Sequence, residues 1–178
     1  MRFWVGIVLP NKTCKKLFRI EKEISEKYKT YYSLKSRIGL HLTLTYQGNI
    51  KEGNLEKIEK AVNEISETTK SFEVEIKGIR RFCKNRFIYA KIIKSKELND
   101  LYKKLFCRLS EFGKIRPLRI FKPHITLAYK DITEENFNEA FKEFKDKKIS
   151  YEFKVNKLYL AKSNPEERLK LFKSFNLK

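Results

Sequence analysis

The chain has few cysteines, few histidines and no long apolar run, and each shortage limits what the protein can be. Its 178 residues include three cysteines, Cys14, Cys83 and Cys107, and no Cys-x-x-Cys pair. That pattern argues against a disulfide framework and against a cysteine-rich zinc site, and it favours reduced thiols in a cytosol. No stretch of about 18 apolar residues is present, which excludes a transmembrane helix.

The first ten residues, MRFWVGIVLP, are apolar but short. They lack a small-residue cleavage site and run into a charged segment, so we expect no signal peptide. We therefore expect a cytoplasmic protein with no membrane partner.

Positive charge is what the chain has in excess. Lys and Arg total 41, Asp and Glu total 22, and the formal net charge is +19. Such a charge favours a polyanion such as nucleic acid. Lysine outnumbers arginine, however, and much of it is interleaved with glutamate, as on ordinary solvated helix faces. The net charge mildly favours an RNA or nucleotide partner, but it does not indicate which reaction, if any, the protein catalyses.

Hydrophobic residues make up 41% of the chain, enough for a core, and the length is that of a single domain, 1–178. Apolar periodicity predicts alternating strands and helices. The predicted strands are 2–9, 41–46, 72–76, 86–93, 124–129, 151–160 and 168–176, and the predicted helices are about 12–28, 53–68, 95–109 and 133–144.

The order of these elements repeats once. Residues 2–82 and 86–161 each read strand, helix, strand, helix, strand, and matching residues lie about 80 positions apart. The predicted strand 168–176 has no counterpart in the first half. We interpret the chain as an internal duplication followed by a C-terminal strand.

The strongest signal is one short motif present in each half, His41-Leu42-Thr43-Leu44 and His124-Ile125-Thr126-Leu127. Alternate residues of a strand point to the same face, so each motif presents an imidazole beside a hydroxyl, roughly 6.5–7 Å apart at the Cα atoms. The apolar residues point the other way, into a core. If the halves pack about a pseudo-twofold axis, the two His-Thr faces oppose each other across a cleft.

That arrangement suits metal-free cleavage of a phosphodiester. One neutral imidazole takes a proton from the attacking water or hydroxyl, and the other, protonated, gives a proton to the leaving oxygen. The hydroxyls of Thr43 and Thr126 donate hydrogen bonds to phosphoryl oxygens. A single such motif would more often be structural, but two copies that contain both histidines of the chain favour catalysis by His41 and His124.

Other residues near the motifs are weaker candidates for substrate binding. Lys122, Arg119 and Arg116 lie in the basic segment before the second motif, where a solvated loop is as good an explanation. Tyr46 and Tyr129 are equivalent under the repeat. Each lies five residues after its histidine, so it falls on the core face unless a bulge intervenes, and otherwise it can stack on a base. No cluster has metal-ligand spacing, so we expect no metal and no cofactor.

These motifs resemble those of the 2H (two-histidine) phosphoesterase superfamily, and most closely its RNA 2',3'-cyclic phosphodiesterase family, also called 2'-5' RNA ligase. Residues 2–10, 41–44 with Gly48, and 121–128 carry the resemblance. Many relatives have a basic residue just after each motif, where this chain has Thr45-Tyr46 and Ala128-Tyr129, and arginine where it has Lys122. The resemblance implies a bilobal α+β fold, with two antiparallel sheets flanked by helices and a central cleft.

The resemblance also implies hydrolysis of RNA 2',3'-cyclic phosphate ends to 2'-phosphates, with weak 2'-5' ligation in some members. The expected partners are RNA ends or nucleotides that bear a cyclic phosphate, and we expect a monomer. Two alternatives stay open: a phosphoesterase acting on another small cyclic phosphodiester or cyclic oligonucleotide, and a non-catalytic RNA-binding module.

Overall fold

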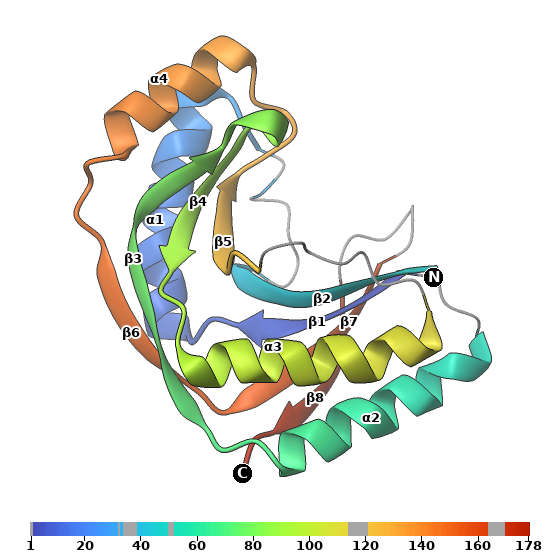
Figure 1. The fold of residues 1–178 in the computed structure, drawn as a ribbon. Helices are drawn as coiled ribbons and strands as arrows, with labels where there is room; N and C mark the ends of the chain where they lie inside the picture. The colour runs from blue at the N-terminus through green and yellow to red at the C-terminus, as the bar shows by residue number, and fades with distance from the viewer. Residues whose placement is uncertain (1, 32, 34–38, 50–51, 114–120, 164–169) are drawn as a thin grey trace.

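A computed structural model describes the chain except for residues 1, 32, 34–38, 50–51, 114–120 and 164–169 (Figure 1). The strands are β1 (Arg2–Val8), β2 (His41–Asn49), β3 (Phe72–Phe82), β4 (Phe87–Ile92), β5 (His124–Ala128), β6 (Ser150–Val155), β7 (Lys157–Ser163) and β8 (Lys170–Asn176). The helices are α1 (Asn11–Tyr28), α2 (Leu55–Glu67), α3 (Lys96–Leu109) and α4 (Glu134–Phe144), with short 3-10 turns η2 (Glu52–Asn54), η3 (Cys83–Asn85) and η4 (Ser110–Phe112).

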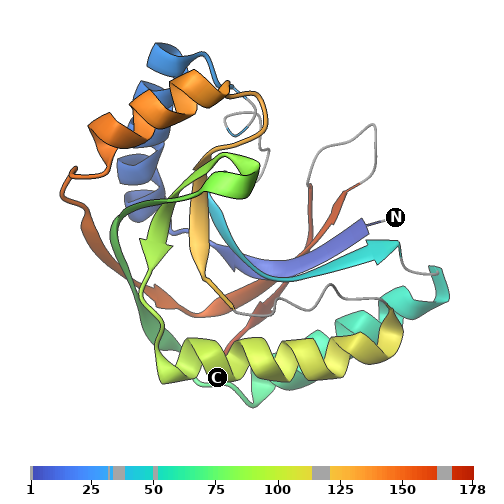
Figure 2. The ribbon, with the colours of Figure 1, turned by 45° about the horizontal axis from the view of Figure 1, so that its top comes forward.

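All eight strands belong to one antiparallel sheet, in the order β6-β3-β4-β5-β2-β1-β7-β8. The α+β class is confirmed, but the expectation of two separate sheets is wrong. β2 and β5 are both central strands, and they join the halves through the pair Leu42–Ile125. The sheet curls steeply where they meet, so that β3, β4 and β5 run across the direction of β1 and β2 (Figures 1 and 2).

The inner six strands are arranged symmetrically about the centre of the sheet, with each strand facing its counterpart from the other half. β2 and β5 lie at the centre, flanked by β1 and β4 and then by β7 and β3. The chain therefore crosses between halves, because β3 pairs with β4 and β6 whereas β7 pairs with β1. The boundaries of the two repeats stay a prediction.

The predicted strand 151–160 is two strands that belong to different halves of the sheet. Asn156 separates β6 from β7. The alternation of buried residues changes phase there: Phe153 and Val155 are buried before the break, and Leu158 and Leu160 after it. A strand that keeps one face buried cannot change phase, so the chain turns and pairs elsewhere.

One face of the sheet carries the helices and the core. The inward apolar residues of the strands form a single cluster with the apolar stripes of all four helices. Side chains cap the N-termini of two helices: Ser95 Oγ accepts from Leu98 N (3.1 Å) at α3, and Thr133 Oγ1 accepts from Asn136 N (3.2 Å) at α4. Within the described ranges, no helix is both long and apolar enough to cross a bilayer.

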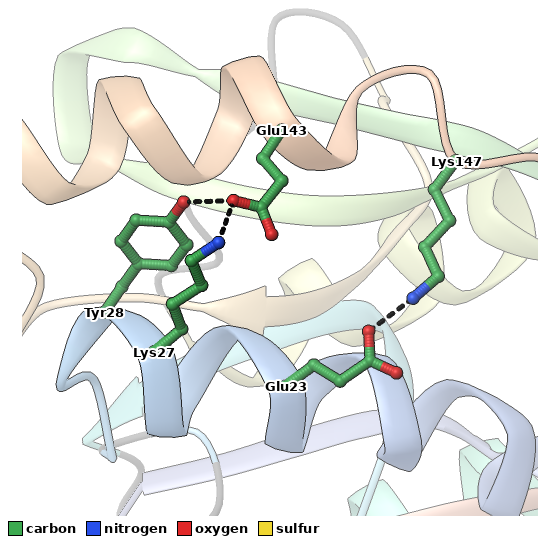
Figure 3. A network of polar contacts seen from close by, with 5 residues as sticks. All are labelled: Glu23, Lys27, Tyr28, Glu143 and Lys147. Atoms are coloured by element: carbon green, nitrogen blue, oxygen red, sulfur yellow. Dashed lines mark hydrogen bonds and ion pairs between the residues drawn. The ribbon is translucent and has the colours of Figure 1, made fainter.

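Polar contacts hold α4 across α1 at the edge of the molecule (Figure 3). Glu143 accepts hydrogen bonds from Tyr28 Oη (2.7 Å) and Lys27 Nζ, and Glu23 accepts from Lys147 Nζ. Exposed ion pairs add little stability. Their effect is to fix the position of α4, which follows directly on the segment after β5.

Candidate active site

The two motifs meet at the centre of the sheet. Leu42 of β2 and Ile125 of β5 are antiparallel partners, and both side chains are 0% exposed in the core. Since neighbours along a strand point to opposite faces, the residues beside this pair point to the helix-free face. The core contact of two apolar side chains thereby positions the polar groups on the opposite face.

The polar residues of both motifs surround this pair. In the antiparallel register, His41 and Thr126 lie to one side of it, and Thr43 and His124 lie to the other. The imidazole of each motif therefore lies toward the hydroxyl of the other, and the two imidazoles are diagonal. All four side chains are half-buried. A phosphate at this place would contact groups from both motifs.

Both histidines are oriented by the same backbone contact. Nδ1 of His41 donates to the Gly39 carbonyl (2.9 Å), and Nδ1 of His124 donates to the Lys122 carbonyl (2.8 Å). A carbonyl oxygen accepts and cannot donate, so the proton of the neutral ring is on Nδ1 and the lone pair is on Nε2. Nε2 is thus the nitrogen of each ring that gains and loses a proton.

Aromatic rings enclose the two imidazoles in different ways. The indole of Trp4 stacks on His41, with centroids 4.9 Å apart and planes at 18°. His124 instead meets Phe82 nearly at right angles (5.2 Å, 87°) and lies close to Tyr89 (5.3 Å, 62°). Burial among such groups disfavours the imidazolium form.

The pKa values of both histidines are accordingly lowered. Burial lowers the pKa of His41 below its ordinary value of 6.5; the hydrogen bond to Gly39 opposes the shift, and the positive charge of His124 adds to it. Burial also lowers the pKa of His124, opposed by the hydrogen bond to Lys122. The charge of His124 thus contributes to the lowered pKa of His41.

Trp4 is a site residue that the motifs did not identify. It is 2% exposed and packs with Ala161, separate from the main core. Its ring lies over Gly6, where an added Cβ would collide with the indole and with the Leu42 carbonyl. The signal was present in β1, because Phe3, Val5 and Ile7 take the core face and leave Trp4 and Gly6 on the other.

Lys91 is a second such residue. It pairs with His124 across β4 and β5 and is exposed. The alternation of Ile88, Ala90 and Ile92 into the core places Lys91 on the face of the histidines. It adds a cation beside the second motif.

Both tyrosines leave the core face because each motif strand is bulged. Between Val5 and Gly6 the partner in β2 jumps from Thr45 to Thr43, and between Ile88 and Tyr89 the partner in β5 jumps from Ala128 to Thr126. One extra residue on each strand shifts the alternation by one.

Core packing, the default expectation for these tyrosines, is therefore wrong for Tyr46. Its side chain is 40% exposed. Tyr129 is half-buried and stacks on Phe87 at 3.9 Å. Both residues follow the bulges and lie beyond the threonines, at matching places in the two halves.

The basic candidates before the second motif are placed only in part. Lys122 is exposed, with Nζ 5.9 Å from the Phe82 ring, and its carbonyl holds His124. Arg116 and Arg119 lie outside the described residues. Among the residues that are described, His, Cys, Asp and Glu side chains form no group of three or more that could hold a metal ion.

Comparison with protein families gives one match over most of the chain. The model of the 2'-5' RNA ligase superfamily matches residues 18–167. The RNA 2',3'-cyclic phosphodiesterase of Methanothermobacter thermautotrophicus is 31% identical over 92 residues, which is 50% of this chain and 50% of that protein. The match therefore spans about half the length of that relative.

Solved structures share the fold over nearly the whole chain. A Thermus thermophilus protein superposes with a TM-score of 0.75 at 20% identity, covering 99% of this chain and 98% of that one. Escherichia coli LigT in its apo form gives 0.73 at 18% identity, covering 99% and 96%. Other structures of LigT are complexes with 3'-AMP and with phosphate.

Proposed function

The chain belongs to the 2'-5' RNA ligase superfamily, and from that premise we propose that it hydrolyses RNA 2',3'-cyclic phosphate ends to 2'-phosphates without a metal ion. His41 and His124 act as the general acid–base pair, and Thr43 and Thr126 bind the phosphoryl oxygens. The same site carries weak 2'-5' ligation when a 5'-hydroxyl takes the place of water.

The observation that carries this proposal is the placement of both motifs around the Leu42–Ile125 pair. It brings two imidazoles and two hydroxyls from segments about 80 residues apart to one face of the sheet. The matching Nδ1 contacts leave both Nε2 atoms for proton transfer. An ordinary structural histidine on a strand needs neither feature.

The reaction follows from the two protonation states of the pair. The neutral imidazole accepts a proton at Nε2 as water attacks phosphorus, and the bond from phosphorus to O3' breaks. The protonated imidazole gives its Nε2 proton to O3', which leaves the phosphate on O2'. Hydrogen bonds from the threonine hydroxyls stabilise the charge that develops on the non-bridging oxygens.

The relatives support a phosphodiester substrate. A protein 31% identical over half of the chain is named for RNA 2',3'-cyclic phosphodiesterase activity, and the structural relative LigT has been crystallised with 3'-AMP and with phosphate. These ligands contain the chemical groups that the two motifs are placed to contact.

The test is hydrolysis of an RNA oligonucleotide with a 2',3'-cyclic phosphate end, with EDTA present. We expect turnover to a 2'-phosphate, and a loss of about 10²–10⁴ in kcat for His41→Ala and for His124→Ala. Lys104→Ala, on the exposed side of α3, is the matched control and should keep full activity.

Three results would contradict parts of the proposal. Absence of turnover on a panel of cyclic phosphodiesters, with RNA binding retained, would favour the non-catalytic alternative. A 3'-phosphate product, or turnover of other cyclic phosphodiesters alone, would reject the RNA-end assignment. Activity abolished by EDTA would reject the metal-free mechanism.

A further inference from the structure

A basic pocket lies beside the second motif and has no part in the reaction described above. It has a volume of about 690 Å³, within the range of ligand sites. Its walls are the turn η3 between β3 and β4, the segment after β5 and the first turns of α4. Four cations line it, Arg81, Lys84, Arg86 and Lys130, against one carboxylate, Glu134.

The cations are held in different ways, and two of them point to an anionic ligand. Arg81 donates to Asn138 Oδ1 (2.9 Å) and lies over the Phe141 ring (4.5 Å), so its guanidinium is fixed at the pocket wall. Lys84 and Arg86 are exposed, and neither side chain has an ion pair or hydrogen bond to another described residue. Four cations with one carboxylate among them still repel each other, and an anion between them relieves that repulsion.

The backbone at the pocket is also unusual. Arg86 has φ 49° and Lys130 has φ 71°, and both are pocket residues in the left-handed region that non-glycine residues seldom adopt. Arg86 adopts this conformation where it closes the turn η3, with its N–H donating to the Cys83 carbonyl, as Lys29 does at the end of α1. The left-handed conformation of Arg86 turns the chain from η3 into β4 at the pocket wall.

Aromatic contacts connect the pocket to the histidine of the second motif. Tyr129 lines the pocket and stacks on Phe87 (3.9 Å), and Phe87 meets the ring of His124 edge-on (6.2 Å). One aromatic ring thus separates the pocket wall from His124. The pocket is therefore adjacent to the place where the end of a strand would react.

We propose that this pocket binds a backbone phosphate of the RNA strand upstream of the cyclic end, so that the substrate is an oligonucleotide and not a mononucleotide. This rests on the proposed function. A nucleoside 2',3'-cyclic phosphate has one phosphate, which the His and Thr residues contact. An RNA end carries further phosphates on its 5' side, and Lys84 and Arg86 receive one of them.

The first test compares two substrates in one double variant. Lys84→Gln/Arg86→Asn removes two charges, and asparagine tolerates the left-handed backbone at position 86. We expect the ratio of kcat/KM on a cyclic-phosphate-ended oligonucleotide to kcat/KM on a nucleoside 2',3'-cyclic phosphate to fall about tenfold. Lys103→Gln/Lys104→Gln, on the exposed side of α3, removes the same charge elsewhere and should leave the ratio unchanged.

The salt dependence gives a second readout in the same assay. Each phosphate contact on a single strand contributes a slope of about −0.7 in a plot of log affinity against log salt. In the pocket variant, we expect the salt dependence of KM for the oligonucleotide to become weaker by about the slope that one phosphate contact contributes. An unchanged slope and an unchanged substrate ratio would overturn the proposal.

Binding is tested without catalysis through two exposed cysteines. Cys83 lines the pocket, whereas Cys107 lies on α3. A 2'-phosphate-ended RNA oligonucleotide should protect Cys83 from alkylation by N-ethylmaleimide and leave Cys107 reactive, and a nucleoside 2'-phosphate should protect neither. Equal protection by both ligands, or protection of neither cysteine by RNA, rejects the subsite.

Failure here is distinguishable from failure of the proposed function. If the wild type turns over both substrates and the ratio of their kcat/KM values is unchanged in the pocket variant, the proposed function stands and the phosphate subsite is rejected. If the wild type is inactive on both substrates, the proposed function is rejected. The alkylation experiment then still shows whether RNA occupies the pocket. Protection of Cys83 by acidic peptides in place of RNA would assign the pocket to a protein partner and overturn the proposal.

Discussion

The indole of Trp4 lies parallel to the imidazole of His41, with ring centroids 4.9 Å apart. Phe87 is the counterpart of Trp4 in the second half, because Val5 and Ile88 each lie just before the bulge of the facing strand. Phe87 meets His124 edge-on and stacks on Tyr129 instead. The two histidines therefore occupy equivalent places on the strands in unlike aromatic surroundings. This difference offers a physical basis for one ring acting as acid and the other as base.

The pKa values of both histidines should lie below the ordinary value for histidine when they are measured by titration. Burial lowers both pKa values from 6.5. The productive form, with one imidazole protonated, is then most populated between two values that both lie below 6.5. We expect kcat/KM to peak on the acid side of pH 6.5 and to fall as the pH rises.

Proton NMR can check this prediction directly, because the chain has two histidines and hence two Cε1–H signals. Their midpoints in the free protein should lie below pH 6.5, and His124→Ala should shift the His41 midpoint upward, since the positive charge of His124 contributes to the lowered pKa of His41. The unfolded chain binds these protons near pH 6.5 and the folded one does not, so stability should decrease as the pH falls from 6.5 through the lowered values. Midpoints at or above 6.5 would contradict the burial argument.

The threonine hydroxyls should matter for the rate more than for the fold. Thr43→Val and Thr126→Val keep the shape and the β-branching but remove a donor, so we expect each to lower kcat by about 10²–10³. Thr→Ser at the same positions retains the hydroxyl and should recover most of the rate. Steady-state kinetics on the cyclic-phosphate substrate, with thermal melts of each variant, provides the measurement; valine variants as active as the serine ones would exclude a phosphoryl contact.

Gly6 should tolerate no side chain. An added Cβ would collide with the Trp4 ring and the Leu42 carbonyl, and the carbonyl belongs to the strand that joins the halves. We expect Gly6→Ala to destabilise the protein by about 1–3 kcal/mol and to disturb the Trp4–His41 stack, seen as a shifted His41 signal. Gly53→Ala is the control, since nothing lies within 4 Å of its added Cβ; equal stability of the two variants would show that β1 adjusts freely.

The chemistry of the site was more predictable than the assembly of the sheet. The His and Thr residues share a face because of a two-residue period, which any local stretch of sequence displays. The pairing of Leu42 with Ile125 joins segments far apart in the chain, and no local pattern specifies it. For that reason the separate sheets predicted from the sequence proved to be one.

Features that depend on a partner strand were missed for the same reason. In a β-bulge, two residues of one strand lie opposite a single residue of the neighbouring strand. The exposure of Tyr46 therefore could not be predicted from the sequence of its own strand alone. Trp4 and Lys91 were recoverable, because strict alternation in β1 and β4 places them opposite the core. The division of 151–160 into two strands was also visible, as a change of phase between Val155 and Leu158.

Glu21 should make the fold less stable as the pH rises. It is 3% exposed on α1, and burial raises its pKa to about 8. In the unfolded chain the carboxyl ionises near pH 4.5, so the folded state holds a proton that the unfolded state has lost. The free energy of unfolding therefore falls by up to about 1.4 kcal/mol per pH unit between these two pKa values.

Glu21→Gln removes the ionisation, so the variant should become progressively more stable than the wild type from pH 5 to pH 8, and the difference should then stay constant. Urea unfolding at pH 5, 7 and 9 measures the difference. Glu26→Gln, an exposed residue of the same helix paired with Lys22, should show no such trend, and an equal pH dependence in both variants would mean that Glu21 ionises normally in the folded protein.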